Sequence, residues 1–439
     1  MAAITLQIHS DGQWHDAVEV SFDSPENGLR SRCSTHYRVG YLVDQFDKLG
    51  TVKSPAISVN LPLGWDIQRG SAPAFLHDII SSGAARRHIL AQEAVPPGMS
   101  IDHMLLQRFA TAPIGHMRIK SAAEAVCAQV KVTGFSREDV LQRGMGFLDL
   151  ARGSGLAING ALGASGEAPK MLISEDASGD FYPNEALPDE EVHRHWFVKY
   201  PRNRAGRTDR NILHSEYCYY RALGEFGFDT ISSEGLAYEP ENLPSLWMQR
   251  FDRKFTPDGV ERIGVESMYS LCGVTQPGSR MNHVEVVEQL AKAWVAARQE
   301  KEIPSMISEY LRRELINLIL GNSDNHGRNL SIIRTKERVA FAPMYDIAPM
   351  VMDREGIVRS TRWPKEIERL GTVDWLAVCA RLVHLADPEW LFNCLQADAR
   401  LLLGLPDLLL DLRLPEETWR SPLIPLRFLG DTFRRWQLM

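Results

Sequence analysis

The stretch from position 321 to position 333 decides the fold, and it reads Gly321-Asn322-Ser323-Asp324-Asn325-His326-Gly327-Arg328-Asn329-Leu330-Ser331-Ile332-Ile333. Apolar residues before it recur at helical spacing, which predicts a helix over residues 305–320. The apolar residues that end it predict a strand. The asparagine-rich part between them is therefore expected to be a loop that joins a helix to a strand.

Two residues of this loop are spaced as in a known catalytic motif. Asp324 and Asn329 are separated by four residues, which is the D-x-x-x-x-N spacing of kinase catalytic loops. In such a loop a carboxylate lies beside the attacking hydroxyl, and a carbonyl oxygen returns to a metal ion on the nucleotide phosphates. The spacing alone is a weak signal, because short motifs often occur by chance.

The residues after the loop strengthen this interpretation. Residues 330–343 read as strand, turn and strand, and this hairpin would return Asp346 to the loop as a second carboxylate. We therefore predict a phosphotransfer site for ATP and Mg2+, in which Asp324 is catalytic and Asn329 and Asp346 hold the metal. His326 is expected to orient its neighbours or to pack, because Asp324 already supplies a base.

A lysine and a glutamate form the second part of the predicted site. Lys199 ends a strand-like run, where its side chain either reaches water or contacts phosphate. The helix predicted over residues 211–223 places Glu216 in an apolar stripe, and a buried carboxylate needs a partner. Lys199 is the predicted partner, as in the lysine–glutamate pair of protein kinases. Asn211 and the nearby arginines are the alternatives.

A glycine-rich stretch is the third part, and it reads Gly163-Ala164-Ser165-Gly166-Glu167-Ala168-Pro169-Lys170. Glycines let backbone N–H groups approach phosphate oxygens, so this stretch is a candidate loop over the ATP phosphates. It is not a Walker A motif, since the chain contains no G-x-x-x-x-G-K-[ST]. A simple turn is the alternative.

The composition is that of a folded cytosolic protein. Of 439 residues, 44% are hydrophobic and 24% are charged, which excludes wholesale disorder. The net charge of −7 argues against a globally cationic nucleic-acid or membrane binder. The six cysteines contain no C-x-x-C pair and suit a reducing compartment. Neither a signal-peptide pattern nor a membrane-spanning run is evident, so we expect a cytoplasmic protein that does not bind membranes.

The order of the expected elements predicts an α+β fold. Residues 4–22 read as a hairpin around an Asp11-Gly12 turn, and helical periods dominate beyond residue 260. We predict a bilobal, protein-kinase-like fold with a β-rich N-terminal module and a mainly helical C-lobe. The predicted boundaries are 1–110 for the module, 111–255 for the N-lobe and 256–439 for the C-lobe.

Together these residues resemble the HipA family of bacterial serine/threonine kinases, the toxin halves of HipBA toxin–antitoxin pairs. The resemblance runs over most of the chain and is strongest in segment 323–329 and in Met344-Tyr345-Asp346. The weaker matches are Ala74–Gly83, Gly166–Lys170, Phe197–Pro201 and Leu246–Arg253.

The resemblance implies a role for each matching residue. Asp324 would be the catalytic base, with Asn329 and Asp346 as magnesium ligands. Lys199 would contact the ATP phosphates. The backbone of Gln249, Arg250 and Phe251 would meet the adenine. The other residues assigned to the ATP site are Ser165, Gly166, Lys170, Glu216 and His326.

The resemblance also implies partners. Family members phosphorylate a serine or threonine of a protein, in known cases an aminoacyl-tRNA synthetase. A HipB-like helix-turn-helix antitoxin restrains them and brings them to operator DNA, so DNA contact would be indirect. Many autophosphorylate a serine in the glycine-rich loop. Gly163 occupies that position here, which makes Ser165 the candidate for autophosphorylation.

Two other functions fit part of the pattern. Asp324, His326 and Asn329 also satisfy the D-x-H-x-x-N motif of aminoglycoside and choline kinases, which phosphorylate small molecules. Those enzymes usually continue with I-D-[WFY] and lack a β-rich module of this kind. The third function is that of a catalytically silent, kinase-shaped binding module, and the altered glycine-rich loop is the feature that favours it.

Overall fold

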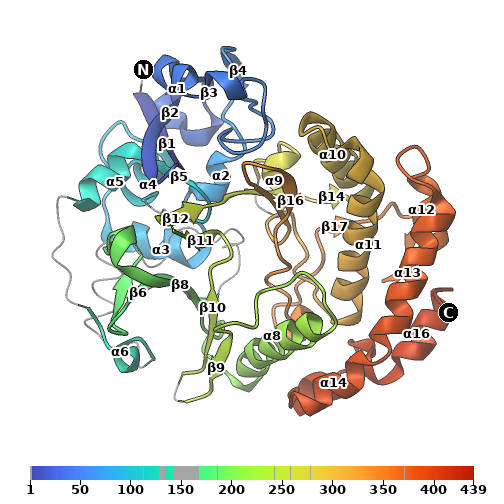
Figure 1. The fold of residues 1–439 in the computed structure, drawn as a ribbon. Helices are drawn as coiled ribbons and strands as arrows, with labels where there is room; N and C mark the ends of the chain where they lie inside the picture. Colours follow the sequence, from blue (N-terminus) through green and yellow to red (C-terminus); the bar gives the residue numbers. More distant parts are fainter. Residues whose placement is uncertain are drawn as a thin grey trace. The chain divides into compact units, whose positions relative to one another are not determined.

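The chain folds into two compact units in the computed structural model (Figure 1). The first unit comprises Met1–Tyr200, Glu239–Thr275 and Ser331–Ala342, and the second comprises Pro201–Tyr238, Gln276–Leu330 and Pro343–Met439. The predicted N-terminal module and most of the predicted N-lobe thus share one unit, and the three predicted boundaries stay predictions. The structure describes residues 2–111, 113–127, 134–141, 168–184, 186–241, 243–257, 259–276, 278–369 and 371–439.

The chain begins with an antiparallel sheet in the order β4-β3-β2-β1-β5. The predicted first hairpin is confirmed, because β1 and β2 pair from Ala2↔Phe22 to Ser10↔Gln13. Asp11 and Gly12 form its turn, and both have positive φ angles, as the favoured two-residue hairpin turns require. The strands are β1 (Ala2–Ser10), β2 (Gln13–Phe22), β3 (Arg32–Tyr37), β4 (Gln68–Ser71) and β5 (Met117–Ile119).

The core of this sheet follows the two-residue period of the sequence. Ile4, Leu6 and Ile8 alternate along β1 and are buried together with apolar residues of β2 and β3. Helix α4 packs into the same core through Met104 and Leu105. The described helices of the first unit are α1 (Val39–Asp44), α2 (Leu76–Ile79), α3 (Gly83–Gln92), α4 (Ile101–Phe109), α5 (Lys120–Cys127), α6 (Arg137–Leu141) and α9 (Met268–Leu271).

A second sheet, in the order β7-β6-β8-β10-β9, contains the strand that ends at Lys199. Strand β8 pairs with β6 on one side and with β10 on the other, so Lys199 lies opposite both Lys170 and Leu246. The strands are β6 (Lys170–Asp176), β7 (Phe181–Pro183), β8 (Val192–Lys199), β9 (Ala237–Glu239) and β10 (Ser245–Gln249).

The strands that follow complete the first unit. The hairpin predicted after the catalytic-loop motif is confirmed, because β15 pairs with β16 from Ile332↔Phe341 to Arg334↔Val339. Strand β13 pairs with the other edge of β15. The strands are β11 (Arg253–Thr256), β12 (Gly259–Arg262), β13 (Gly264–Ser267), β15 (Ser331–Arg334) and β16 (Val339–Phe341).

A buried polar network ties the N-terminal module to these strands. The carboxylate of Glu266 accepts hydrogen bonds from Ser58 Oγ at 2.6 Å and from the backbone N–H of Val59 at 2.9 Å. Arg334 Nε lies 3.6 Å from the same carboxylate. The Arg334 guanidinium also donates to the carbonyl oxygens of Ala56 and Ile57. One ion pair therefore holds β13, β15 and the segment around residue 57 together.

Helices dominate the second unit, as predicted. Helix α11 covers the predicted helix 305–320 almost completely, and α8 extends the predicted helix 211–223 at both ends. No helix among the described residues is both long and apolar enough to cross a membrane. The described helices are α8 (Arg207–Glu225), α10 (His283–Ala296), α11 (Ile303–Ile319), α12 (Trp375–Arg381), α13 (Pro388–Leu402), α14 (Leu405–Asp411), α15 (Glu416–Arg420) and α16 (Leu429–Arg435).

The strands of the second unit are short. Strands β14 (Met281–Asn282) and β17 (Thr361–Arg362) form a parallel pair. Strands β18 (Glu368–Arg369) and β19 (Thr372–Val373) form an antiparallel one. The β14–β17 pair joins the start of α10 to the segment that follows residue 350.

Replacing Arg334 tests the buried network. We expect R334M to lower the free energy of unfolding by about 3–5 kcal/mol, because it leaves the Glu266 carboxylate buried without its cation. The control is K336M. Lys336 lies on the same β15–β16 hairpin as Arg334 and forms an exposed ion pair with Asp11 of the β1–β2 turn, so its loss should cost about 1 kcal/mol or less. Urea unfolding measures both changes. Equal losses in the two variants would contradict the assigned role of Arg334.

Candidate functional site

The predicted catalytic loop connects α11 to β15, and a glycine sets its start. Gly321 has a φ of 69°, and a Cβ atom added there would lie 2.8 Å from Ile424 Cγ1. A side chain is therefore excluded both by backbone conformation and by packing. The carbonyl oxygen of Gly321 accepts a hydrogen bond from the N–H of Val351 at 3.1 Å, which fixes the direction in which the loop leaves the helix.

Asp324 and Asn329 are joined directly. Asn329 Nδ2 donates to the carbonyl oxygen of Asp324 at 2.7 Å, so the motif closes on itself. The N–H of Asp324 donates to Asn322 Oδ1 at 3.2 Å. The carboxylate of Asp324 is partly accessible, with 19% of the side chain exposed. The loop thus presents one carboxylate at its surface while its backbone is held from two sides.

His326 is placed to orient Asp324. The N–H of Arg328 donates to His326 Nδ1 at 3.2 Å, so Nδ1 is an acceptor and the ring proton of the neutral histidine is on Nε2. Nε2 lies 3.5 Å from Asp324 Oδ1. The ring therefore turns its N–H toward the carboxylate, as expected of an orienting residue.

Asp346 is held in a strained conformation beside the same loop. Its φ of 55° is left-handed, which is uncommon for an aspartate and persists only where neighbouring contacts enforce it. The N–H of Asp346 donates to Tyr220 Oη at 2.7 Å. Its carbonyl oxygen accepts from Asn322 Nδ2 at 3.2 Å. Asn322 therefore connects the backbones of Asp324 and Asp346.

Glu216 belongs to this network through a tyrosine. The hydroxyl of Tyr220, one helical turn further along α8, donates to Glu216 Oε1 at 2.8 Å. The same hydroxyl oxygen accepts from Asp346, so Glu216 acts on the metal-ligand candidate through Tyr220. Glu216 is buried, as predicted. Its pairing with Lys199 stays a prediction.

The oxygen atoms present suit a magnesium ion. Asn329 Oδ1 is shielded from solvent and accepts no hydrogen bond from the residues that the structure describes. A buried amide oxygen without a hydrogen-bond donor requires another partner, and a cation is a suitable one. Asp346 supplies a carboxylate, and magnesium prefers oxygen ligands of these two types. The amide and carboxylate donor set therefore fits Mg2+.

The predicted ATP-site residues of the first unit lie mostly at the ends of the strands of the second sheet. Lys199 is the last residue of β8, and only 8% of it is exposed. Lys170 begins β6 and Gln249 ends β10. The side chain of Phe251 packs in a small core with Ile114, Leu172 and Val265. Ser165 and Gly166 lie outside the described residues.

The side chain of Arg250 is committed to a structural pair. Its Nε and Nη2 donate to the carboxylate of Asp252 at 2.9 and 2.7 Å, and its Nη1 donates to Asn184 Oδ1 at 3.0 Å. Arg253 Nη1 and the N–H of Gly115 donate to the same carboxylate. The side chain of Arg250 is thus occupied, and its backbone groups are what it can offer to the adenine contact that the family resemblance implies.

Sequence reasoning missed four residues that shape the site. Asn322, Asn325, Tyr220 and Tyr345 hold the loop or Asp346 in place, and Tyr345 Oη donates to the carbonyl oxygen of Arg328 at 2.7 Å. The density of asparagines in the loop was a usable signal, because short amides replace backbone hydrogen bonds in irregular segments. The spacing of Glu216 and Tyr220 was another.

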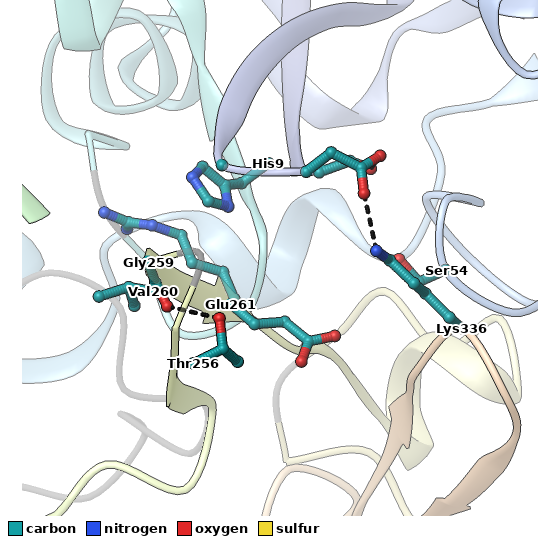
Figure 2. Close-up of a pocket in the computed structure, with 11 residues that line it drawn as sticks. His9, Ser54, Thr256, Gly259, Val260, Glu261 and Lys336 are labelled. Atoms are coloured by element: carbon teal, nitrogen blue, oxygen red, sulfur yellow. Dashed lines mark hydrogen bonds and ion pairs between the residues drawn. The ribbon is translucent and has the colours of Figure 1, made fainter.

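A separate pocket of ≈390 Å3 lies in the first unit (Figure 2). It is lined by the hairpin tips at Asp11 and Gly259 and contains none of the predicted site residues. Lys336 pairs with Asp11 across it at 2.7 Å, and Figure 2 shows this contact. Its charged lining residues are two cations, Arg262 and Lys336, and two acids, Asp11 and Glu261, so the lining carries no net charge that would select an ion.

Comparison with known proteins shows which family and which fold the chain resembles. The family model described as the HipA-like C-terminal domain matches residues 162–389. The Y4mE protein of Sinorhizobium fredii (strain NBRC 101917 / NGR234), whose name assigns it provisionally to the kinases, is 28% identical over 204 residues. That alignment covers 46% of this chain and 44% of the relative, so it spans less than half of the relative's length.

A solved structure matches nearly the whole chain. It contains the toxin–antitoxin system HipA and HipB of Shewanella oneidensis MR-1 with its operator DNA. The match has a TM-score of 0.64 at 16% sequence identity and covers 98% of this chain and 97% of the matched chain. At this identity the likeness establishes the fold. The α+β, kinase-like fold predicted from the sequence is thereby confirmed.

Replacing Asp252 tests the buried pair beside the predicted adenine contact. Burial raises the pKa of the Asp252 carboxyl, but the charges of Arg250 and Arg253 outweigh it and hold that pKa well below its usual range. A lowered pKa contributes stability above about pH 4 that is lost as the pH falls. We expect D252N to lose about 3–5 kcal/mol at neutral pH, since two arginines stay buried without their counter-ion.

The pH profile of unfolding supplies the second measurement for D252N. The fall in stability below about pH 4 should be shallower in D252N than in the wild type, because the group that titrates there is gone. The exposed Asp66→Asn variant is the control and should behave like the wild type. Identical acid profiles for D252N and the wild type would refute the assignment.

Proposed function

Because the chain belongs to the HipA-like C-terminal domain family and has a kinase-like fold, we propose that it is an ATP-dependent serine/threonine protein kinase of the HipA type. The observation that carries this proposal is the closed Asp324–Asn329 motif. The side-chain nitrogen of Asn329 donates the hydrogen bond that fixes the loop, while its side-chain oxygen is available to a cation.

In the proposed reaction the chain's own groups position the reactants. The carboxylate of Asp324, oriented by His326, accepts the proton of a serine or threonine hydroxyl. The hydroxyl oxygen then bonds to the γ-phosphorus of ATP, the bond from that phosphorus to the bridging oxygen breaks, and ADP leaves. Asn329 and Asp346 would hold Mg2+, which when bound neutralises charge on the phosphates. Asp346 is held for this task by Tyr220 and Asn322.

The first unit supplies the remaining groups in this proposal. Lys199 contacts the phosphates of ATP, and its pairing with Glu216 would fix it as in protein kinases. The stretch Gly163–Lys170 covers the phosphates, with Ser165 as the candidate for autophosphorylation. The backbone of Gln249, Arg250 and Phe251 meets the adenine. The committed side chains of Arg250 and Phe251 support a backbone role there.

We further propose a HipB-like helix-turn-helix antitoxin as the partner. The matched Shewanella structure contains HipA, HipB and operator DNA. The chain's net charge of −7 disfavours strong contact with DNA on its own, so the partner would supply that contact. The proposed substrate is a serine or threonine of a cytosolic protein such as an aminoacyl-tRNA synthetase, which the enzyme would phosphorylate as a toxin.

Replacing Asp324 tests the reaction. With Mg-ATP and a cell lysate, we expect D324A to reduce protein phosphorylation by at least about 100-fold, the usual contribution of a positioned base. D411A, which changes an exposed aspartate on α14, is the control. Equal phosphorylation by wild type and D324A would overturn the proposal. Transfer to aminoglycosides or choline in place of protein would assign the chain to the small-molecule kinases. ATP binding without any transfer would make it a silent module.

Replacing Asn329 tests the metal site without relying on catalysis. Mg2+ with a non-hydrolysable ATP analogue should raise the melting temperature of the wild type, because a ligand that binds only the folded state stabilises it. N329L lacks the amide oxygen and should lose most of that increase, whereas the exposed-site control D411A should keep it. An unchanged increase in N329L would show that the metal binds elsewhere.

A further inference from the structure

One buried acid contacts the catalytic loop and has no part in the proposed chemistry. Glu314 lies on α11, and only 2% of it is exposed. Both of its carboxylate oxygens accept from Asn325 Nδ2, at 2.9 and 2.8 Å. Asn325 is the residue between Asp324 and His326. The helix that precedes the loop therefore reaches forward and holds the loop at the position next to the proposed base.

The opposite side of Glu314 is also built from buried polar groups. His283, the first residue of α10, places Nε2 at 3.2 Å from Glu314 Oε2. Its Nδ1 lies 2.6 Å from Tyr310 Oη, and its ring packs on Trp363 with the centroids 4.7 Å apart. The exposed fraction of His283 is 0%. Glu314 thus lies between one histidine, His283, and one asparagine, Asn325.

The backbone of Asn325 is held by the same substructure. The N–H of Thr361 donates to the carbonyl oxygen of Asn325 at 3.3 Å. Thr361 lies on β17, which pairs in parallel with β14, and β14 leads directly into His283. The side chain and the backbone of Asn325 therefore both connect to elements that meet at His283. A shift of any one of them would move the loop.

Keeping an acid at this position is costly. Burial raises the pKa of Glu314 to about 7, against the opposing influence of Arg359 and of the Asn325 hydrogen bonds. Buried charges are often replaceable by apolar residues without loss of stability, so packing alone gives no reason for a carboxylate here. The two hydrogen bonds to Asn325 do give a reason, because a carboxylate is the side chain that offers both oxygens as acceptors.

We propose that Glu314 is a positioning residue of the catalytic loop, which acts through Asn325 to set the position of Asp324. This inference rests on the proposed kinase function of Asp324. Only the ionised Glu314 offers two acceptors, so the loop is held most firmly at a pH above the pKa of this carboxyl.

Glu314 is the group of this cluster that titrates near neutral pH. His283, which faces it from α10, stays neutral there, because burial and the Arg359 charge hold its pKa well below its usual range. Arg359, which precedes β17, and Glu368, the first residue of β18, influence Glu314 and form an ion pair with each other. Asn317 and Asn325 are uncharged hydrogen-bond partners of Glu314, and Tyr310 contacts His283.

The test compares E314Q with E309Q under the kinase assay. E309Q changes an acid on the same helix that pairs with Arg312 and Arg313 instead of the loop. We expect E314Q to lower kcat by about 10- to 100-fold with KM for ATP changed less than about threefold, as misplacement of one reacting group predicts. The loss should be largest near about pH 8 and shrink near about pH 6, where wild-type Glu314 is protonated and resembles glutamine.

A swapped pair gives the rescue. E314Q/N325D exchanges the amide and the carboxylate, and it should recover part of the kcat that E314Q loses. A purely structural role predicts a loss that is independent of pH and no rescue. A kcat of E314Q equal to that of E309Q at every pH would overturn the inference even though the wild type is active.

Hydrogen exchange tests the inference independently of activity. Peptides that cover residues 321–330 should exchange faster in E314Q than in E309Q, while peptides from α8 and α13 stay unchanged. Unchanged exchange in the loop would overturn the positioning role whether or not the chain proves to be a kinase. If the loop exchanges faster in E314Q but the wild type has no kinase activity, the positioning role of Glu314 stands and the proposed kinase function is rejected.

Discussion

The hydrogen bond from Asn329 Nδ2 to the carbonyl oxygen of Asp324 is the contact on which the rest of the site depends. It closes a loop that has no helix or strand to keep its shape. An asparagine suits this task because its amide has donors on one atom and an acceptor on the other. The donor fixes the loop, and the acceptor is available to the proposed metal. Aspartate would keep the acceptor and lose the closure.

Buried carboxylates recur where distant parts of the chain must keep a fixed register. Glu266 joins β13 to Ser58 and Val59, and Asp252 joins the end of β10 to Gly115. Glu314 does the same over a shorter span, from α11 to Asn325. Burying each of these acids costs the free energy of its hydration, and this cost is offset only when several donors form hydrogen bonds to the carboxylate in good geometry. A buried acid therefore tolerates few alternative arrangements of its donors, and this restriction is what the three positions share.

Periodicity and motif spacing predicted much of this structure. The β1–β2 hairpin, helices α8 and α11 and the β15–β16 hairpin follow from local patterns, because each buries one face at a constant period. The D-x-x-x-x-N spacing identified the loop. Tyr220 and Asn322 escaped prediction because a single hydroxyl or amide finds its partner only after the chain has folded. Their partner, the backbone of Asp346, is more than 20 residues away from either. The catalytic, metal-binding and ATP-binding roles assigned to individual residues, from Asp324, Asn329 and Asp346 to Lys199 and Gly163–Lys170, remain predictions.

The left-handed backbone of Asp346 shows how the proposed metal site is prepared in advance. Such a conformation costs about 1–3 kcal/mol in an aspartate and persists only under external restraint. Here the restraint comes from two sides, since Tyr220 accepts from its N–H and Asn322 donates to its carbonyl oxygen. Both of these bonds use the backbone of Asp346. The backbone position of Asp346 is therefore fixed by the protein itself, and binding of the proposed metal would not have to supply the energy for that ordering.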